Sequence, residues 1–112
     1  MSDPQTFLPL TPLSFEILLS LADGPRHGYG IIKEAEARSG TPFASSTGTL
    51  YLAIRRLQKD GLLAPARSGD GDSRRQAYDL TELGREVAVA EAERLEARVI
   101  DARAKALLSG SR

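Results

Sequence analysis

The chain has 112 residues, of which 41% are apolar and 27% are charged, so it fits one modest globular domain. It contains no cysteine, which excludes disulfides and thiolate metal sites and suits a reducing cytoplasm. There is no signal-peptide pattern and no run of about 18 apolar residues, so we expect no membrane span. The net charge is zero, but residues 26–78 hold nine bases against five acids, whereas residues 1–25 hold three acids and no base. The middle of the chain can therefore present a positive face.

Residues 1–10 are predicted to form a short tail, and a first helix follows them. Thr11 and Pro12 have the pattern of an N-cap followed by proline at the first helical position. Apolar residues then recur at helical spacing: Leu13, Ile17, Leu18 and Leu21. Gly24 and Pro25 end this helix.

Two more helices are predicted in the middle of the chain. The second runs from about Gly28 to Arg38, with three residues on one face: Tyr29, Ile32 and Ala35. The third runs from about Ser46 to Asp60, and Gly61 is placed to cap its C-terminus. Its core-facing residues follow the i, i+4, i+7 pattern: Leu50, Ile54 and Leu57.

A hairpin and a long helix complete the predicted elements. Residues 62–67 and 74–80 are predicted strands on either side of a polar, glycine-rich turn, and Thr81 caps a helix to about Leu108. This order predicts a mainly helical (α+β) fold. Residues 11–80 form a winged helix-turn-helix with a two-stranded wing, 81–108 a dimerisation helix, and 109–112 a tail.

The third predicted helix carries the candidate DNA contacts. On another face from its apolar residues lies a stripe of hydrogen-bond donors: Thr47, Tyr51, Arg55 and Gln58. Short hydroxyls at its N-terminus suit phosphate contact, namely Ser45, Ser46, Thr47 and Thr49, and Gly48 permits close approach. Arginine favours guanine in a major groove. The alternative is an ordinary amphipathic helix with a solvated polar face.

The hairpin adds a second candidate contact to DNA. Arg67, Arg74 and Arg75 flank its turn, where they can grip phosphates or enter a minor groove. Asp70 and Asp72 weaken the positive field at the tip, so we favour the arginines at the base. The alternative is an ordinary hairpin with a solvated, charged turn.

The last predicted helix favours a homodimer. It carries a heptad-like, alanine-rich seam: Ala92, Leu95, Val99, Ala102 and Ala106. Mixed charges flank the seam and help to orient a helix pair: Glu91, Glu93, Arg94, Glu96, Arg98, Asp101 and Arg103. A dimer would place two recognition helices about 34 Å apart, on successive major grooves. The alternative is a helix packed only on its own domain.

Enzyme functions find little support in the residues. His27 is the single histidine, and without cysteine it cannot build a typical zinc site. We expect it to serve as a cap or packing residue. The acidic residues form no evident catalytic pair, so we expect neither an enzyme nor a cofactor.

Three segments resemble the PadR family of regulators. They are His27-Gly-Tyr-Gly-Ile31, the run Gly48-Thr-Leu-Tyr-Leu-Ala-Ile-Arg-Arg-Leu-Gln-Lys-Asp-Gly-Leu62, and Arg75-Gln-Ala-Tyr-Asp-Leu-Thr-Glu-Leu-Gly84. The resemblance implies a homodimeric winged-helix repressor that dimerises through its last helix and releases double-stranded DNA when a small molecule binds. Leu52 and Ala77 depart from the family pattern, which often has proline and a second aromatic residue there.

The residues allow two interpretations of the effector pocket and two of the winged helix. The resemblance implies an effector pocket near the dimer interface, and Phe15 and Leu19 either line such a pocket or, as we favour, pack against the partner chain. The zero net charge and the acidic tip of the wing also leave a different function open. In that alternative, the winged helix is a protein-interaction module without specific DNA binding.

Overall fold

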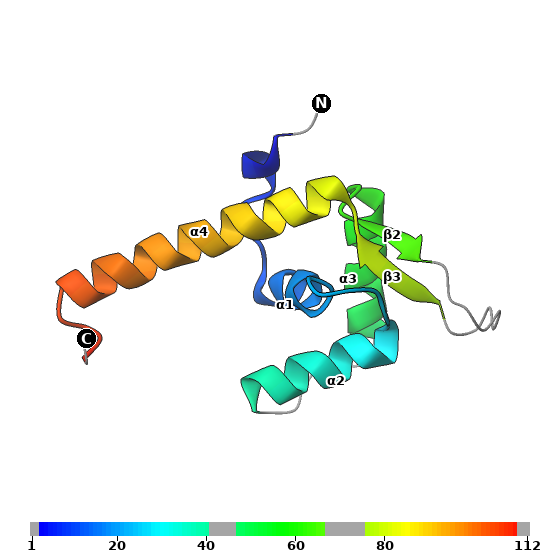
Figure 1. Ribbon diagram of the computed structural model, residues 1–112, viewed down its shortest axis with the longest axis horizontal. Helices are drawn as coiled ribbons and strands as arrows, with labels where there is room; N and C mark the ends of the chain where they lie inside the picture. The colour runs from blue at the N-terminus through cyan, green and yellow to red at the C-terminus, as the bar shows by residue number, and fades with distance from the viewer. Residues whose placement is uncertain (1–2, 41–46, 67–75, 110–112) are drawn as a thin grey trace.

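The computed structural model describes residues 3–40, 47–66 and 76–109, which form four α-helices, one 3₁₀ helix and a small antiparallel sheet (Figure 1). In chain order the elements are η1 (Pro4–Phe7), α1 (Pro12–Ser20), β1 (Arg26–His27), α2 (Gly28–Ser39), α3 (Thr47–Lys59), β2 (Leu63–Ala66), β3 (Ala77–Leu80) and α4 (Glu82–Ala104). The predicted mainly helical fold, with a hairpin wing and a long last helix, is confirmed. No helix in this part of the chain is long and apolar enough to cross a bilayer.

The sheet has three strands rather than the two expected from sequence. Its order is β1-β3-β2, and both pairs are antiparallel. Tyr78 of the central strand lies opposite Arg26 on one side and Pro65 on the other. The additional strand β1 has two residues, too few for any alternation of apolar and polar side chains to be recognised.

The core lies where α1, α2, α3, the sheet and the first half of α4 meet. Its largest members come from every one of these elements: Ile17, Leu18, Leu21, Ile31, Leu50, Ile54, Leu57, Leu62, Leu63, Tyr78 and Val87. The predicted apolar face of α2 was wrong in one respect, because Tyr29 is 67% exposed and Ile31 is buried with Ala35.

The N-terminal segment is part of the folded body. Phe7, Leu8 and Leu10 pack against the core, and η1 lies along α4 (Figure 1). The backbone N–H of Leu10 donates to a carboxylate oxygen of Glu91 at 3.3 Å, and Arg94 Nε donates to the other oxygen at 2.7 Å. Glu91 is only 2% exposed, so it is not available to orient a partner helix, as the charges beside the seam were predicted to do. Through the hydrogen bond from Leu10, its carboxylate instead holds the N-terminal segment against α4.

This buried carboxylate makes the stability of the protein depend on pH. Its hydrogen bond from Arg94 outweighs burial and holds the pKa of Glu91 below its ordinary value. Because the pKa is lowered on folding, the charge stabilises the protein above the ordinary glutamate range. That contribution is lost as the pH falls through the lowered pKa.

We expect Glu91→Gln, which keeps an oxygen for the Leu10 N–H, to flatten the acid limb of the stability curve. The check is the free energy of unfolding by urea between pH 3 and pH 7, with Glu93→Gln as the exposed control. An acid limb equally steep in wild type and Glu91→Gln would contradict this role.

The start of α4 is tied to the end of α3. Thr81 Oγ1 accepts from the N–H of Gly84 at 2.9 Å, as the predicted cap requires, and donates to the carbonyl of Gly61 at 2.6 Å. The Thr81 N–H donates to the carbonyl of Leu62. Gly61 has φ +83 and ends α3, as predicted, because glycine adopts this conformation without strain. These contacts, with Gly84, form the α3–α4 joint.

The second half of α4 projects away from the body (Figure 1). The helix ends at Ala104 rather than near Leu108. Ala106 has φ +63, and the N–H of Leu107 donates to the carbonyl of Ala102, which closes the helix one turn early. Ala106 is therefore not on the helical seam where the sequence pattern placed it.

Candidate nucleic-acid interface

The outward side of α3 carries three exposed cations, Arg55, Arg56 and Lys59. None of them forms an ion pair with any residue that the structure describes. By contrast, other arginines of the fold are paired with carboxylates: Arg26, Arg38, Arg94 and Arg98. Unpaired cations on one helix face concentrate positive potential there, although the net charge of the whole chain is zero.

The predicted donor stripe on α3 is only partly open to solvent. Arg55 is exposed, whereas Tyr51 and Gln58 are half-buried. The Tyr51 ring lies against Gly28, where an added Cβ would come within 2.2 Å of the phenolic oxygen. Tyr51 therefore holds α2 against α3 as well as standing on the candidate DNA face.

The structure brings Tyr78 of β3 to the same junction. Burial raises the pKa of Tyr78 above its ordinary value, the neighbouring Tyr51 adds to this, and Arg55 opposes it. The Tyr78 phenol thus stays neutral, so it adds no negative charge beside Arg55. In the sequence, Tyr78 stands out only as part of the family resemblance, because the pattern of a short strand does not indicate that Tyr78 meets α3.

The N-terminal turn of α3 is only partly described. Gly48 and Thr49 are exposed there, as close approach to DNA requires. Thr47 begins the helix, and Ser45 and Ser46 lie outside the described residues. The wing arginines Arg67, Arg74 and Arg75 also lie outside them. Strand β2, at the base of the wing, contacts α3, so this part of the hairpin lies beside the helix (Figure 1).

An ion-pair network fixes α2 against α1. Arg38 bonds the Glu16 carboxylate at 2.6 Å, the buried Ser20 hydroxyl at 3.2 Å and Glu34 at 3.2 Å. Arg26 bonds the Ser20 carbonyl at 2.7 Å and Glu34 at 3.3 Å. Since Arg26 belongs to β1, the network joins both helices to the sheet. Charge patterning along the sequence gave no sign of it, because its members lie up to 22 residues apart.

The predicted dimer residues fall in two places. Leu95, Val99 and Ala102 lie on the projecting second half of α4, where Val99 is 41% exposed, and Ala92 lies just before it. Phe15 and Leu19 are half-buried on α1. Ile100, which the seam pattern omits, is also exposed on α4. These apolar groups lack a partner sufficient to bury them within the described chain.

His27 occupies the N-cap position of α2 but makes no capping hydrogen bond through its side chain. Its ring is half-buried, and Nε2 is buried with no hydrogen-bond partner among the residues that the structure describes. The structure therefore supports packing over capping for this residue. Among the described residues no cluster of three metal-ligating side chains occurs.

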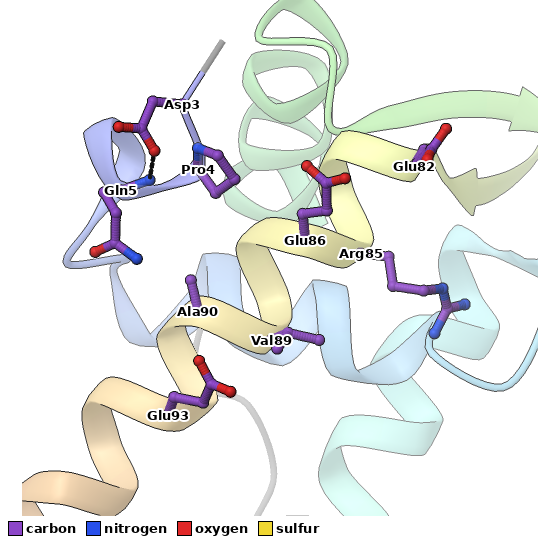
Figure 2. Close-up of a pocket in the computed structure, with 9 residues that line it drawn as sticks. All are labelled: Asp3, Pro4, Gln5, Glu82, Arg85, Glu86, Val89, Ala90 and Glu93. Atoms are coloured by element: carbon purple, nitrogen blue, oxygen red, sulfur yellow. Dashed lines mark hydrogen bonds between the residues drawn. The ribbon is translucent and has the colours of Figure 1, made fainter.

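An acidic cavity of about 450 Å³ is lined by residues of η1 and α4 (Figure 2). Its carboxylates come from Asp3, Glu82, Glu86 and Glu93. Arg85 points away from these carboxylates in Figure 2 and donates to the carbonyl of Ala22 at 3.1 Å. The carboxylates on this surface repel phosphate. The negative surface therefore lies on η1 and α4, whereas the exposed cations described above lie on α3.

Comparison with known proteins agrees with this geometry. A structure of RosR from H. salinarum is 26% identical with a TM-score of 0.66, covering 91% of this chain and 99% of that one. A PadR family transcription regulator from Clostridium difficile R20291 is 27% identical with a TM-score of 0.65, covering 88% and 100%. A curated relative, an uncharacterized 37.1 kDa protein in transposon TN4556 of Streptomyces fradiae, is 38% identical over 88 residues; the match spans 76% of this chain but only 24% of that protein.

The family comparison covers most of the winged-helix unit. Residues 17–90 match the model of the transcriptional regulator PadR-like family. The matched region runs from α1 through the wing into the first half of α4, and so includes α3 with its unpaired cations. The chain belongs to the PadR-like family of transcriptional regulators.

Proposed function

We propose that this protein is a homodimeric repressor that binds a two-fold symmetric DNA operator and releases it when a small molecule binds. The observation that carries the proposal is the exposed, unpaired cationic face of α3 beside the base of the wing. An α-helix fits into the major groove of DNA, where Arg55 can reach base edges. Arg56 and Lys59 flank it and are placed to contact phosphates.

The experiment that tests DNA binding uses the DNA upstream of the gene for this protein. We expect a labelled duplex from that region to bind at low salt and to bind more weakly as salt rises, because counterions are released from phosphates. A scrambled duplex of equal length is the control for specificity. No binding at low salt would contradict the proposal and favour a protein-interaction module instead.

Dimerisation through α4 is a separate expectation. Sedimentation at micromolar concentration should give a species of twice 12.1 kDa. Placing a carboxylate on the seam with Val99→Asp should shift it toward monomer, because the charge would have to be buried between two helices. Glu86→Gln, on the first half of the same helix, is the control. A wild-type monomer under these conditions would remove the seam from the proposal.

A further inference from the structure

A second cavity, of about 560 Å³, lies between the N-terminal segment, the start of α1 and the side of α3. We call it the α1–α3 groove. Its volume is in the range of sites that hold small organic molecules. Neither Phe15 nor Leu19, the pair considered for an effector pocket, lines it.

The floor of the groove is apolar, and part of it is open to solvent. Phe7, Leu10 and Leu13 contribute from the N-terminal side, while Leu52 and Ala53 contribute from α3. Leu52 is 63% exposed, which is a large exposure for an apolar residue on a helix otherwise well packed. Covering such a surface with an apolar group removes it from water and favours binding.

The rim of the groove is basic. Arg55, Arg56 and Lys59 line it, and one acid, Asp60, lies among them. As noted above, these cations form no ion pair with any described residue. We propose that the α1–α3 groove binds a small organic anion with an apolar body, such as a medium-chain carboxylate. The carboxylate would meet Arg56 and Lys59, and the chain would cover Leu52.

The charges favour this occupant over a second copy of the chain. The exposed apolar residues that follow α4, Leu107 and Leu108, have Arg103 and Lys105 close to them in the chain. Seating these residues in the groove would bring Arg103 and Lys105 close to the three cations of the rim, which is unfavourable. An organic cation meets the same repulsion, and bare phosphate leaves the apolar floor uncovered.

Occupancy of the groove affects DNA binding if the proposed function holds. The anion would use cations on the same helix that we place against DNA, and it would set a negative charge beside the phosphates. The groove would thus be the site through which a small molecule weakens DNA binding, and this consequence rests on the proposed function.

Displacement of a fluorescent probe tests the site without DNA. 8-Anilinonaphthalene-1-sulfonate, an aromatic anion, is bound to the full chain and displaced by decanoate, decanol or decyltrimethylammonium, which differ in head-group charge. We expect decanoate to bind at least tenfold more tightly than decanol, and the cation to bind most weakly. Equal displacement by decanoate and decanol, or stronger displacement by the cation, would overturn the proposal, as would failure of decanoate to bind.

Variants locate the binding to this groove. Leu52→Gln and the double variant Arg56→Gln/Lys59→Gln should each weaken decanoate at least fivefold, with only the double variant bringing its affinity near that of decanol. Arg103→Gln/Lys105→Gln removes two cations at the C-terminal end of α4 and is the matched control. Decanoate affinity unchanged by both groove variants would place the binding elsewhere and refute the site.

A last measurement separates the site from the proposed function. We expect decanoate to weaken binding of the upstream duplex at least fivefold in wild type but not in Leu52→Gln. If decanoate binds and the duplex affinity is unchanged, the regulatory consequence is wrong while the site stands. If the protein binds no DNA, the proposed function fails, and the displacement experiment still decides the site.

Discussion

Gly84→Ala is expected to destabilise the protein by about 3 kcal/mol, even though alanine favours helices more than glycine does. A Cβ at this position would lie 2.0 Å from the backbone carbonyl oxygen of Leu62. Backbone atoms cannot turn away as a flexible side chain can, so α4 must move off the end of α3. The measurement is urea unfolding followed by circular dichroism, and the midpoint of thermal unfolding should fall by roughly 10–20 °C.

Gly30→Ala is the matched control for this prediction. Gly30 is also helical, but a Cβ there meets only the Cβ of Arg26 at an ordinary 3.6 Å. The change should therefore be neutral or should stabilise the protein by up to about 1 kcal/mol. Equal effects of the two substitutions would show that close packing at Leu62 does not decide the identity of residue 84.

Arg55→Ala is expected to weaken specific DNA binding by about 1–3 kcal/mol, and Lys59→Ala to lower the salt dependence by about one counterion. The reason is that an arginine on base edges supplies sequence discrimination, while a lysine on phosphate supplies charge alone. Fluorescence anisotropy at several salt concentrations, with specific and scrambled duplexes, separates the two effects. Tyr51→Phe tests its hydroxyl without removing the ring that packs against Gly28.

Arg103→Ala is the control for the DNA measurements, since it removes an exposed cation from α4. It should leave both the affinity and the salt dependence within about twofold of wild type. If Arg55→Ala is indistinguishable from Arg103→Ala on the specific duplex, α3 is not the recognition helix.

The sequence predicts the element order well because local signals mark the ends of elements. Thr11 and Thr81 accept the capping hydrogen bonds expected of them, and Gly61 has the positive φ of a helix end. The i, i+4, i+7 pattern of α3 also places Leu50, Ile54 and Leu57 in the core. These features depend on a few neighbouring residues, so they can be recognised without knowing the fold.

The features that the sequence did not predict depend on contacts between residues far apart in the chain. Glu91 is buried because Leu10, 81 residues earlier, brings its N–H to the carboxylate. Tyr29 is exposed although it is aromatic, and the aromatic ring that packs against the start of α2, at Gly28, is that of Tyr51. The same holds for the candidate site. The sequence shows that α3 carries several cations, but it does not show that these cations lack carboxylate partners among the described residues. Arg56 and Lys59 were not selected as candidate site residues, because sequence shows which charges are present but not which are paired.

The α3–α4 joint has a mechanical consequence. Because α4 starts in direct contact with the backbone at the end of α3, the two helices are expected to move together as one rigid unit. In the proposed dimer, a small rotation where the two copies of α4 cross would swing both copies of α3 through the same angle. The separation of the two operator half-sites would then be set far from the DNA, by the side chains that fix that crossing angle.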